Sequence, residues 1–334
     1  MLTIRPFNFS DDDYEAAVVC WNRNFPEVLE TAVQYRHRDE SREPHRFFKR
    51  LIAEAEGQVV ATAVFCETWW QKHAGKHYLE VIVLPEQQGK GFGTAIYQEV
   101  LKQLAERKPT MLSTYTGDDQ QPARRFLEKR GFSVAIREPA SRLDLTAFTA
   151  QEFAPVCNQV TTSGITIEPL TELQATTPDW AHQMWDLHWI VIKDVPGTAP
   201  WERESFEEYQ REILQNPEFE PAGHFIARDG QRLVGLTNLW PTKADPKKLW
   251  CGLTGVIPEY RRRGIAIALK VRAAEYARQQ GYHHIDTDNE EKNPMYGINL
   301  RLGFSPLPAW LGYELTLESD ENLHGAAELA TGTE

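Results

Sequence analysis

Hydrophobic and polar positions along the chain predict an alternation of short strands and helices. Residues 2–6 and 165–169 read as strands because apolar and polar residues alternate. After each comes a polar stretch and then an apolar segment, around Trp21 and around Trp185, whose spacing predicts a helix. Further strands are predicted at Val59–Phe65, Tyr78–Leu84, His224–Ala227, Leu233–Leu239 and Leu249–Ile257. The pattern indicates an α/β chain of the α+β type.

The same order of elements occurs twice. The last predicted strand of each set runs into a similar phrase, residues 83–93 and 256–266, and each phrase opens a predicted helix. Gly91 and Gly264 are 173 residues apart, and Gly131 and Gly303 are 172 apart. The two separations differ by only one residue, which indicates an internal duplication.

The duplication sets the predicted domain boundaries. We expect an N-terminal domain over 1–150, a linker over 151–164, a C-terminal domain over 165–318 and a polar tail over 319–334. A chain of 334 residues is long enough for two such domains. The linker is predicted from Pro155, Asn158 and the Thr/Ser/Gly residues that follow.

Composition favours a cytoplasmic protein. Hydrophobic residues make up 41% and charged residues 25%, and the longest apolar runs, such as Val81–Leu84, are far too short to cross a membrane. The N-terminus lacks a basic stretch followed by an apolar one, so no secretory signal is predicted. The four cysteines lie far apart without a Cys-x-x-Cys pair, which favours reduced thiols and no metal site.

Charge is unevenly distributed along the chain. The net charge is −12, of which −1 falls in residues 1–150 and −11 in residues 151–334. An acidic half repels phosphate backbones, so we expect no nucleic-acid partner and favour cationic small molecules. Surplus carboxylates that keep the protein soluble explain the same imbalance.

Two glycine-containing loops carry the candidate chemistry. Both fit the pattern Gln/Arg-x-x-Gly-x-Gly/Ala between a strand and a helix. Glycine lets the backbone approach an anion, and a helix N-terminus directs free N–H groups at it, so the loops predict diphosphate binding. The dinucleotide fingerprint does not fit, because its third glycine is misplaced here. The loop residues are Gln88, Gly89, Lys90, Gly91, Phe92 and Gly93, and Arg261, Arg262, Arg263, Gly264, Ile265 and Ala266.

This loop in its strand–loop–helix setting resembles the pyrophosphate loop of the GNAT (GCN5-related N-acetyltransferase) superfamily. The resemblance covers about residues 2–148 and 165–318, and the arrangement resembles tandem members such as mycothiol synthase. It implies two tandem GNAT domains, each a twisted, mostly antiparallel mixed sheet flanked by helices, and acetyl-CoA as co-substrate without a metal. The implied cofactor-binding residues are the two loops together with Val83, Val256, Ile257, Asn289 and Asn293.

The resemblance also implies how the reaction proceeds. An amine attacks the thioester directly in a ternary complex, and a backbone N–H on the strand before the loop, at Val83 or Val256, polarises the carbonyl. The family's general acid is a tyrosine four residues before the closing Gly-Phe. Leu127 and Asn299 occupy these positions, so Asn299 and the nearby Tyr296 are the candidates.

The family's usual base position falls on His77 in the first copy and on Trp250 in the second. Histidine can act as a base near neutral pH, whereas tryptophan cannot. In the second copy we therefore expect Asp286 or Asp288, which face the same side of a strand, to act as base or to hold a cationic substrate. Capping of the next turn explains these aspartates too. Glu80 and Tyr115 are the equivalent candidates in the first copy.

The predicted function is transfer of acetyl from acetyl-CoA to a primary amine of a small molecule. We expect the second domain to catalyse it and the first to be degenerate, since Leu127 cannot donate a proton. Carboxylates and aromatic residues within 201–220 suit an amine acceptor, although a solvated helix explains them equally. The alternatives are a non-catalytic acyl-CoA-binding or regulatory protein and transfer from aminoacyl-tRNA, against which the acidic charge argues. Monomer and homodimer stay open.

Overall fold

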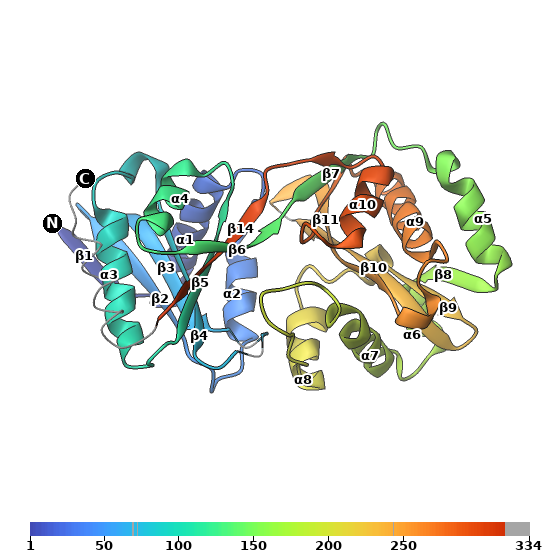
Figure 1. Cartoon of the computed structure of the whole chain (residues 1–334), viewed down its shortest axis with the longest axis horizontal. Coiled ribbons are helices and arrows are strands. Elements are labelled where there is room, and N and C mark those ends of the chain that lie inside the picture. The colour runs from blue at the N-terminus through green and yellow to red at the C-terminus, as the bar shows by residue number, and fades with distance from the viewer. Residues whose placement is uncertain (69, 72, 243, 318–334) are drawn as a thin grey trace. The chain divides into compact units, whose positions relative to one another are not determined.

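The computed structural model describes residues 1–317 except 69, 72 and 243, so the tail predicted over 319–334 lies outside the described residues. Within them the chain forms two compact units, each built on one seven-stranded, mostly antiparallel sheet with helices on its faces (Figure 1). This confirms the predicted fold class.

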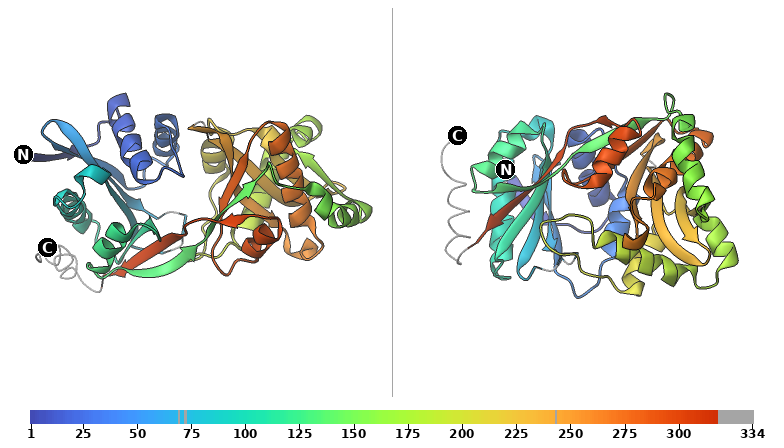
Figure 2. Two further views of the ribbon diagram at one scale, coloured as in Figure 1. Left: turned by 90° about the horizontal axis from the view of Figure 1, so that it is seen from above. Right: turned by 45° about the vertical axis from the view of Figure 1, so that its right-hand side comes forward.

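Among the described residues, the first unit comprises those within 1–137, 198–202 and 310–317. Helices α1 and α2 cover one face of its sheet, and α3 and α4 pack with the hydrophobic core on the other (Figure 2). The helices are α1 (Asp11–Asn24), α2 (Ala32–Glu40), α3 (Phe92–Ala105) and α4 (Gln121–Glu128). The strands, in sheet order, are β1 (Leu2–Pro6), β2 (Phe48–Ala55), β3 (Gln58–Glu67), β4 (Lys76–Val83), β5 (Met111–Gly117), β14 (Trp310–Thr316) and β6 (Ser133–Glu138).

The second unit comprises residues 138–197 and 203–309. Leu187 and Val191 of α7 and Leu269 of α9 pack in its core. Its helices are α5 (Ala154–Thr162), α6 (Leu170–Thr176), α7 (Trp180–Ile192), α8 (Phe206–Tyr209), α9 (Ile265–Gln279) and α10 (Pro294–Arg301). Its strands, in sheet order, are β13 (Ser305–Pro306), β7 (Ala140–Asp144), β12 (His284–Asp288), β11 (Asp245–Val256), β10 (Arg232–Thr242), β9 (His224–Asp229) and β8 (Ile165–Pro169).

Each sheet contains one strand from the other half of the sequence. Strand β14 lies between β5 and β6, with Gly312 opposite Tyr115, and β7 lies between β12 and β13, with Ser141 opposite Thr287. The two compact units therefore do not follow the predicted boundaries at 150 and 165. Alternating polarity predicts that a segment is a strand, but it does not tell which sheet the strand joins.

Residues 151–164 are not an extended linker. They form a 3₁₀ turn (Ala150–Phe153) and helix α5, whose Val160 is buried in the core of the second unit. Pro155 lies in the first turn of α5, a position where proline is compatible with a helix because its missing N–H would have no intrahelical partner. The proline therefore marks a helix start rather than a linker.

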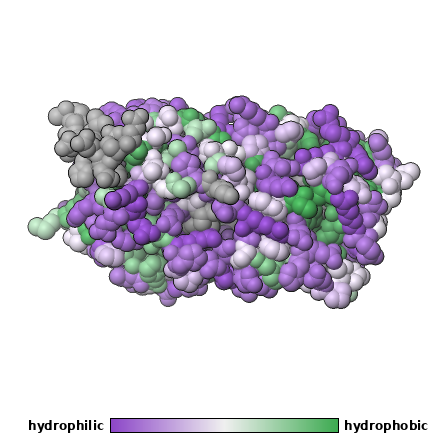
Figure 3. Space-filling model, turned by 60° about the horizontal axis from the view of Figure 1, so that its bottom comes forward, coloured by the Kyte–Doolittle hydropathy of each residue, from purple (hydrophilic) through white to green (hydrophobic). Residues whose placement is uncertain are grey.

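The four cysteines are free thiols, and three of them are buried. In the described ranges, no helix is long and apolar enough to cross a membrane. Hydrophilic residues predominate on the face drawn in Figure 3, with smaller hydrophobic groups between them.

Strand β14, from the second half of the sequence, is exchanged into the sheet of the first unit. We therefore expect that a substitution in β14 destabilises that sheet. Tyr313 of β14 is fully buried, and its hydroxyl donates to Glu128 Oε1 at 2.9 Å. We expect Tyr313→Ala to cost about 3–5 kcal/mol, as truncation of a buried aromatic side chain does. Amide hydrogen exchange should accelerate in β5 and β6 before it does in β9–β11. Leu300→Ala, at an exposed position, is the control, and earlier acceleration in β9–β11 would contradict the exchange.

Candidate functional site

The two glycine-containing loops share one backbone conformation. Gly89 and Arg262 occupy equivalent left-handed positions with φ of +74° and +65°, and Gly91 and Gly264 do so with φ of +80° and +83°. The last two are the N-caps of α3 and α9, and neither makes a side-chain capping bond. The first N–H groups of each helix lack intrahelical partners, so both loops have the backbone geometry for binding an anion.

The first residue of each motif holds the loop to the preceding strand. Gln88 Nε2 donates to the carbonyl oxygen of Val83 at 3.2 Å, and Arg261 Nε donates to that of Val256 at 2.9 Å. Arg261 is also paired with Asp194. Asp194 therefore partly neutralises the positive charge of Arg261, and less of that charge is left to attract a diphosphate.

The surroundings of the two loops differ. Among the described residues, and leaving aside the chain on either side of Gly91, no heavy atom lies within 4 Å of a Cβ placed on this glycine. A Cβ on Gly264 would lie 2.4 Å from Val156 Cγ2 of α5. Within its own unit the first loop is therefore open at this point, whereas α5 packs against the second.

The strand before each loop pairs with its parallel neighbour only at its beginning. Strand β4 pairs with β5 over Lys76–Tyr78, and β11 pairs with β12 over Lys248–Trp250. Beyond these points the two strands are no longer paired. Each sheet therefore opens at the end of the strand that leads into the glycine loop.

The backbone N–H groups of Val83 and Val256 point toward these openings. Leu84 N donates to Val60 O at 3.0 Å, and Ile257 N donates to Val234 O at 2.9 Å. Because hydrogen-bonded and non-bonded pairs alternate along antiparallel strands, the preceding residue directs its N–H to the other side. These are the N–H groups expected to donate to a carbonyl oxygen, and that role stays a prediction.

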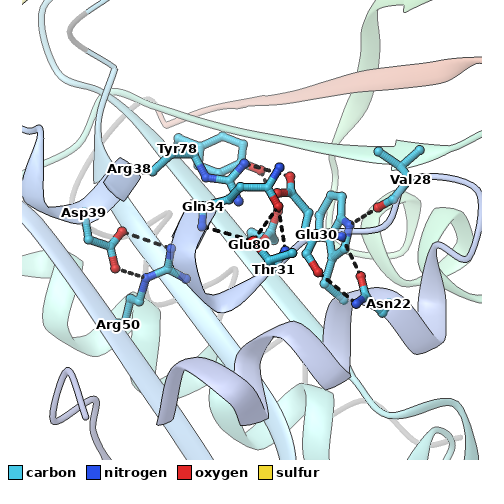
Figure 4. Close-up of polar contacts among 11 residues, drawn as sticks. Asn22, Val28, Glu30, Thr31, Gln34, Arg38, Asp39, Arg50, Tyr78 and Glu80 are labelled. Atoms are coloured by element: carbon cyan, nitrogen blue, oxygen red, sulfur yellow. Dashed lines mark hydrogen bonds and ion pairs between the residues drawn. The ribbon is translucent and has the colours of Figure 1, made fainter. Parts of the chain in front are cut away.

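A carboxylate of the first unit lies on β4 beside this opening. Leu79, Val81 and Val83 pack toward α3, so alternation directs Tyr78 and Glu80 to the face covered by α1 and α2 (Figure 4). The Tyr78 hydroxyl donates to Glu80 Oε2 at 3.0 Å.

Burial raises the pKa of the Glu80 carboxyl above its usual range, whereas Arg50 and the Tyr78 hydrogen bond act in the opposite direction. Burial likewise keeps the pKa of the Tyr78 hydroxyl well above 10, so this group stays protonated as a donor. A carboxylate whose pKa is shifted toward neutrality can accept a proton from an ammonium group.

The chain between α1 and α2 surrounds this carboxylate with further polar groups. Asn22 binds both backbone groups of Glu30, accepting from its N at 2.8 Å and donating to its O at 3.0 Å. Thr31 and Gln34 form a capping box at the start of α2. Arg38, one turn further along α2, donates to Glu30 Oε1 at 2.8 Å. Figure 4 shows Glu30, Gln34 and Arg38 grouped with Tyr78 and Glu80.

Of the two aspartates predicted in the second unit, Asp286 is part of a buried ion pair. Arg142 of β7 binds both of its carboxylate oxygens, at 2.7 and 2.8 Å, and Lys248 Nζ lies 3.6 Å away. With only 3% of the residue exposed, this arrangement favours a structural role that joins β12 to β7.

Asp288, the other predicted aspartate, has a shifted pKa. It is half-buried, and burial raises its pKa to about 6. The pKa of Glu138 is raised to about 7, first by burial and then by the charges of Asp288 and Glu290. The second unit therefore holds two neighbouring carboxyls that titrate near neutral pH.

Two of the predicted residues on and before α10, Asn289 and Asn299, are hydrogen-bonded to each other. Asn299 is fully buried and donates from Nδ2 to Asn289 Oδ1 at 2.6 Å, while Asn293 accepts from Met295 N at the N-terminus of the helix. The Asn299 Oδ1 atom has no hydrogen-bond partner in the part of the chain that the structure describes. Tyr296 is half-buried on the same helix.

The first-copy candidates His77 and Tyr115 differ in accessibility. His77 is 2% exposed, its Nδ1 lies 3.1 Å from the oxygen of Gly75, and burial lowers its pKa. It lies on the core side of β4, which argues against the predicted role as a base. Tyr115 is 38% exposed on β5, beside Gly312 of the exchanged strand.

The segment 201–220, predicted to wall the acceptor pocket, divides between the units. Trp201 belongs to the first unit, and residues from Arg203 onward belong to the second. Two of its carboxylates are engaged inside the second unit: Glu204 Oε1 lies 3.0 Å from His188 Nδ1, and Glu208 closes a capping box with Ser205.

Sequence reasoning missed Tyr78 as a partner of Glu80, and also Glu30, Gln34 and Arg38. A signal for α2 was present, because Thr31 and Gln34 have the three-residue spacing of a capping box. The position of Glu30 carried no such signal, because it is fixed by Asn22, a side chain from the preceding helix.

Both halves of the chain resemble known proteins. The sequence model of the acetyltransferase (GNAT) family matches residues 14–132 and 182–304, one segment in each half of the chain. No curated protein matched the chain.

Solved structures with a similar fold include a tandem GNAT protein from the clavulanic acid biosynthesis pathway, with 17% identity over 95% of this chain and 98% of that one and a TM-score of 0.71. A GCN5-related N-acetyltransferase from Sphaerobacter thermophilus is 16% identical over 94% of this chain and 95% of that one, with a TM-score of 0.68. A glucosamine N-acetyltransferase region of a fungal multi-domain GH3 β-N-acetylglucosaminidase is 16% identical over 94% of this chain but 38% of that one, with a TM-score of 0.66. At these identities the matches show the tandem fold.

The raised pKa of Glu138 predicts a pH-dependent stability. A folded-state pKa near 7, against 4.5 in the unfolded chain, means that the folded protein binds this proton more tightly. The stability this contributes is present below about pH 4.5 and is lost as pH rises through 7. We therefore compare the free energy of unfolding of Glu138→Gln with that of the wild type at two pH values. The difference should be on the order of 1–3 kcal/mol more favourable to the variant at pH 8 than at pH 4. Urea unfolding at both pH values measures this, with the exposed Glu152→Gln as control. Equal effects at the two pH values would contradict it.

Proposed function

This chain belongs to the acetyltransferase (GNAT) family, and we propose that it transfers an acetyl group from acetyl-CoA to a primary amine of a small molecule. The observation that carries this proposal is the Tyr78–Glu80 pair on the face of β4 that α1 and α2 cover, beside the point where β4 and β5 part. Strand β4 and the loop that follows it would thus supply three groups. These are a base, an N–H directed at the thioester carbonyl oxygen, and backbone N–H groups that bind an anion.

We place the reaction in the first unit, although the sequence favoured the second. The first loop is open at Gly91, whereas Val156 packs against Gly264. At the position 173 residues after Glu80 the second unit has Leu253, which cannot act as a base. Asp286, one of the two predicted aspartates, is engaged by Arg142.

Each group in the first unit has a defined task in this proposal. Backbone N–H groups at the N-terminus of α3, with Lys90 close by, hold the diphosphate of acetyl-CoA. The Val83 N–H donates to the thioester carbonyl oxygen, where negative charge develops. Glu80 removes a proton from the acceptor's ammonium group. The free amine attacks the carbonyl carbon, and the C–S bond breaks as the C–N bond forms. The nitrogen then loses its second proton, which the departing CoA thiolate takes up.

The second unit is the alternative location, and Asp288 favours it, because its pKa of about 6 also suits a base near neutral pH. The likeness to mycothiol synthase stays a prediction, as does the amine itself. A non-catalytic acyl-CoA-binding protein is the alternative from another functional class, and the same experiment distinguishes it.

Two isosteric substitutions test the location. Glu80→Gln should lower kcat about 10²- to 10⁴-fold, the usual contribution of a positioned base, whereas Asp288→Asn should change it little. The assay follows CoA thiol release with a panel of aliphatic primary amines. Loss of turnover in Asp288→Asn with retention in Glu80→Gln would move the reaction to the second unit. A wild type that binds acetyl-CoA but acetylates no amine would favour the non-catalytic alternative.

The Tyr78 hydrogen bond predicts a change in the pH profile. The bond stabilises the ionised carboxylate and so lowers the pKa of Glu80. Tyr78→Phe should raise that pKa and so shift the acid limb of the pH profile of kcat/KM to higher pH by about 1 unit. The plateau of kcat/KM at high pH should be largely preserved. Tyr97→Phe, a buried tyrosine on α3, is the control. An unmoved limb would show that Glu80 is not the titrating base.

A further inference from the structure

One carboxylate oxygen close to the proposed base has no hydrogen-bond partner among the residues that the structure describes. The side chain of Glu30 is 14% exposed, and its Oε1 accepts from Arg38. Its Oε2 is buried and makes no hydrogen bond to any group that the structure describes. A buried acceptor left without a donor destabilises the folded protein, so such an atom calls for a ligand or another physical reason.

The position of Glu30 is fixed on both sides along the chain. Asn22 holds its N–H and its carbonyl oxygen, and Trp21 Nε1 donates to Val28 O at 2.6 Å just before it. The capping box of α2 begins at the next residue, Thr31. With its backbone held this way and Oε1 bound to Arg38, Oε2 is pre-organised to accept a donor.

Glu30 and Glu80 belong to one electrostatic site. The negative charge of Glu30 raises the pKa of the Glu80 carboxyl, while the positive charge of Arg38 lowers it. Figure 4 shows these three side chains in one group. The nearby Arg50 is neutralised by Asp39, to which it donates two hydrogen bonds at 2.8 and 3.0 Å. Two carboxylates against Arg38 leave a net negative site, which favours a cationic ligand, and the unpartnered Oε2 of Glu30 offers a place for a second nitrogen.

We propose that the acceptor is a diamine, with one nitrogen presented to Glu80 for acetylation and the second, as an ammonium group, donating to Glu30 Oε2. This rests on the proposed function and assigns Glu30 as a specificity-determining residue. A monoamine of the same length fills only the position at Glu80. An acceptor with a carboxylate in place of the second amine brings a like charge toward Glu30.

The test compares amines that differ only at the second position. The probes are 1,3-diaminopropane through 1,6-diaminohexane, the n-alkylamine of matching length for each, and 4-aminobutyrate. The wild type should prefer at least one diamine over its matched monoamine by about 10-fold or more in kcat/KM, the effect expected for a charged hydrogen bond. Glu30→Gln should abolish this preference, because it should raise KM for the diamine far more than KM for the matched monoamine. Glu40→Gln, an exposed position on α2, is the charge-matched control.

A second variant keeps the inference testable if Glu30→Gln folds poorly. Glu30→Asp retains the charge but withdraws the oxygens by one methylene, so the preferred diamine should become longer. Calorimetric titration with the preferred diamine gives a readout that does not need turnover. Equal use of diamines and monoamines, unchanged in Glu30→Gln, would overturn the diamine inference and leave the acetyltransferase proposal standing. A wild type that acetylates no amine would overturn the proposed function, and the calorimetric comparison with Glu30→Gln would then decide whether Glu30 binds diamines.

Discussion

The structure depends on the way in which β4 and β5 part after three paired residues. Lys76–Tyr78 pair with Met111–Ser113, and beyond that point the backbone of β4 has a free side. The N–H of Val83 faces this opening, and the glycine loop follows directly. Because β14 pairs along all of β5, from Met111 to Gly117, β5 stays in the sheet although β4 leaves it. The exchanged strand thus helps to keep the opening in place.

The two units keep the same backbone and differ in side chains. Both have left-handed residues at corresponding loop positions, and both tie the first motif residue to the carbonyl at the end of the strand. In the second unit, however, Asn238 Oδ1 accepts from the N–H of Leu253 at 2.7 Å, at the point that corresponds to Glu80. A backbone that supports the same chemistry in both halves therefore carries a carboxylate at this point only in the first.

Sequence reasoning recovered what depends on local order and spacing. The strand–loop–helix repeats follow from polarity periods and from glycines that need left-handed conformations, and the structure has them where they were predicted. It did not recover what depends on distant pairing. Asp286 resembles a free strand-end carboxylate in sequence, but Arg142, 144 residues away, binds both of its oxygens once β7 joins the second sheet. Glu30 lies in a polar stretch without a motif, and only the folded chain brings it close to Glu80.

The central claim is that acetyl-CoA binds at the loop of the first unit. Amide hydrogen exchange with and without acetyl-CoA tests it directly, because ligand contact with backbone N–H groups slows their exchange. The account predicts slower exchange in peptides that cover residues 83–95, with residues 256–268 unchanged. Slower exchange confined to residues 256–268, or no change in either segment, would contradict it.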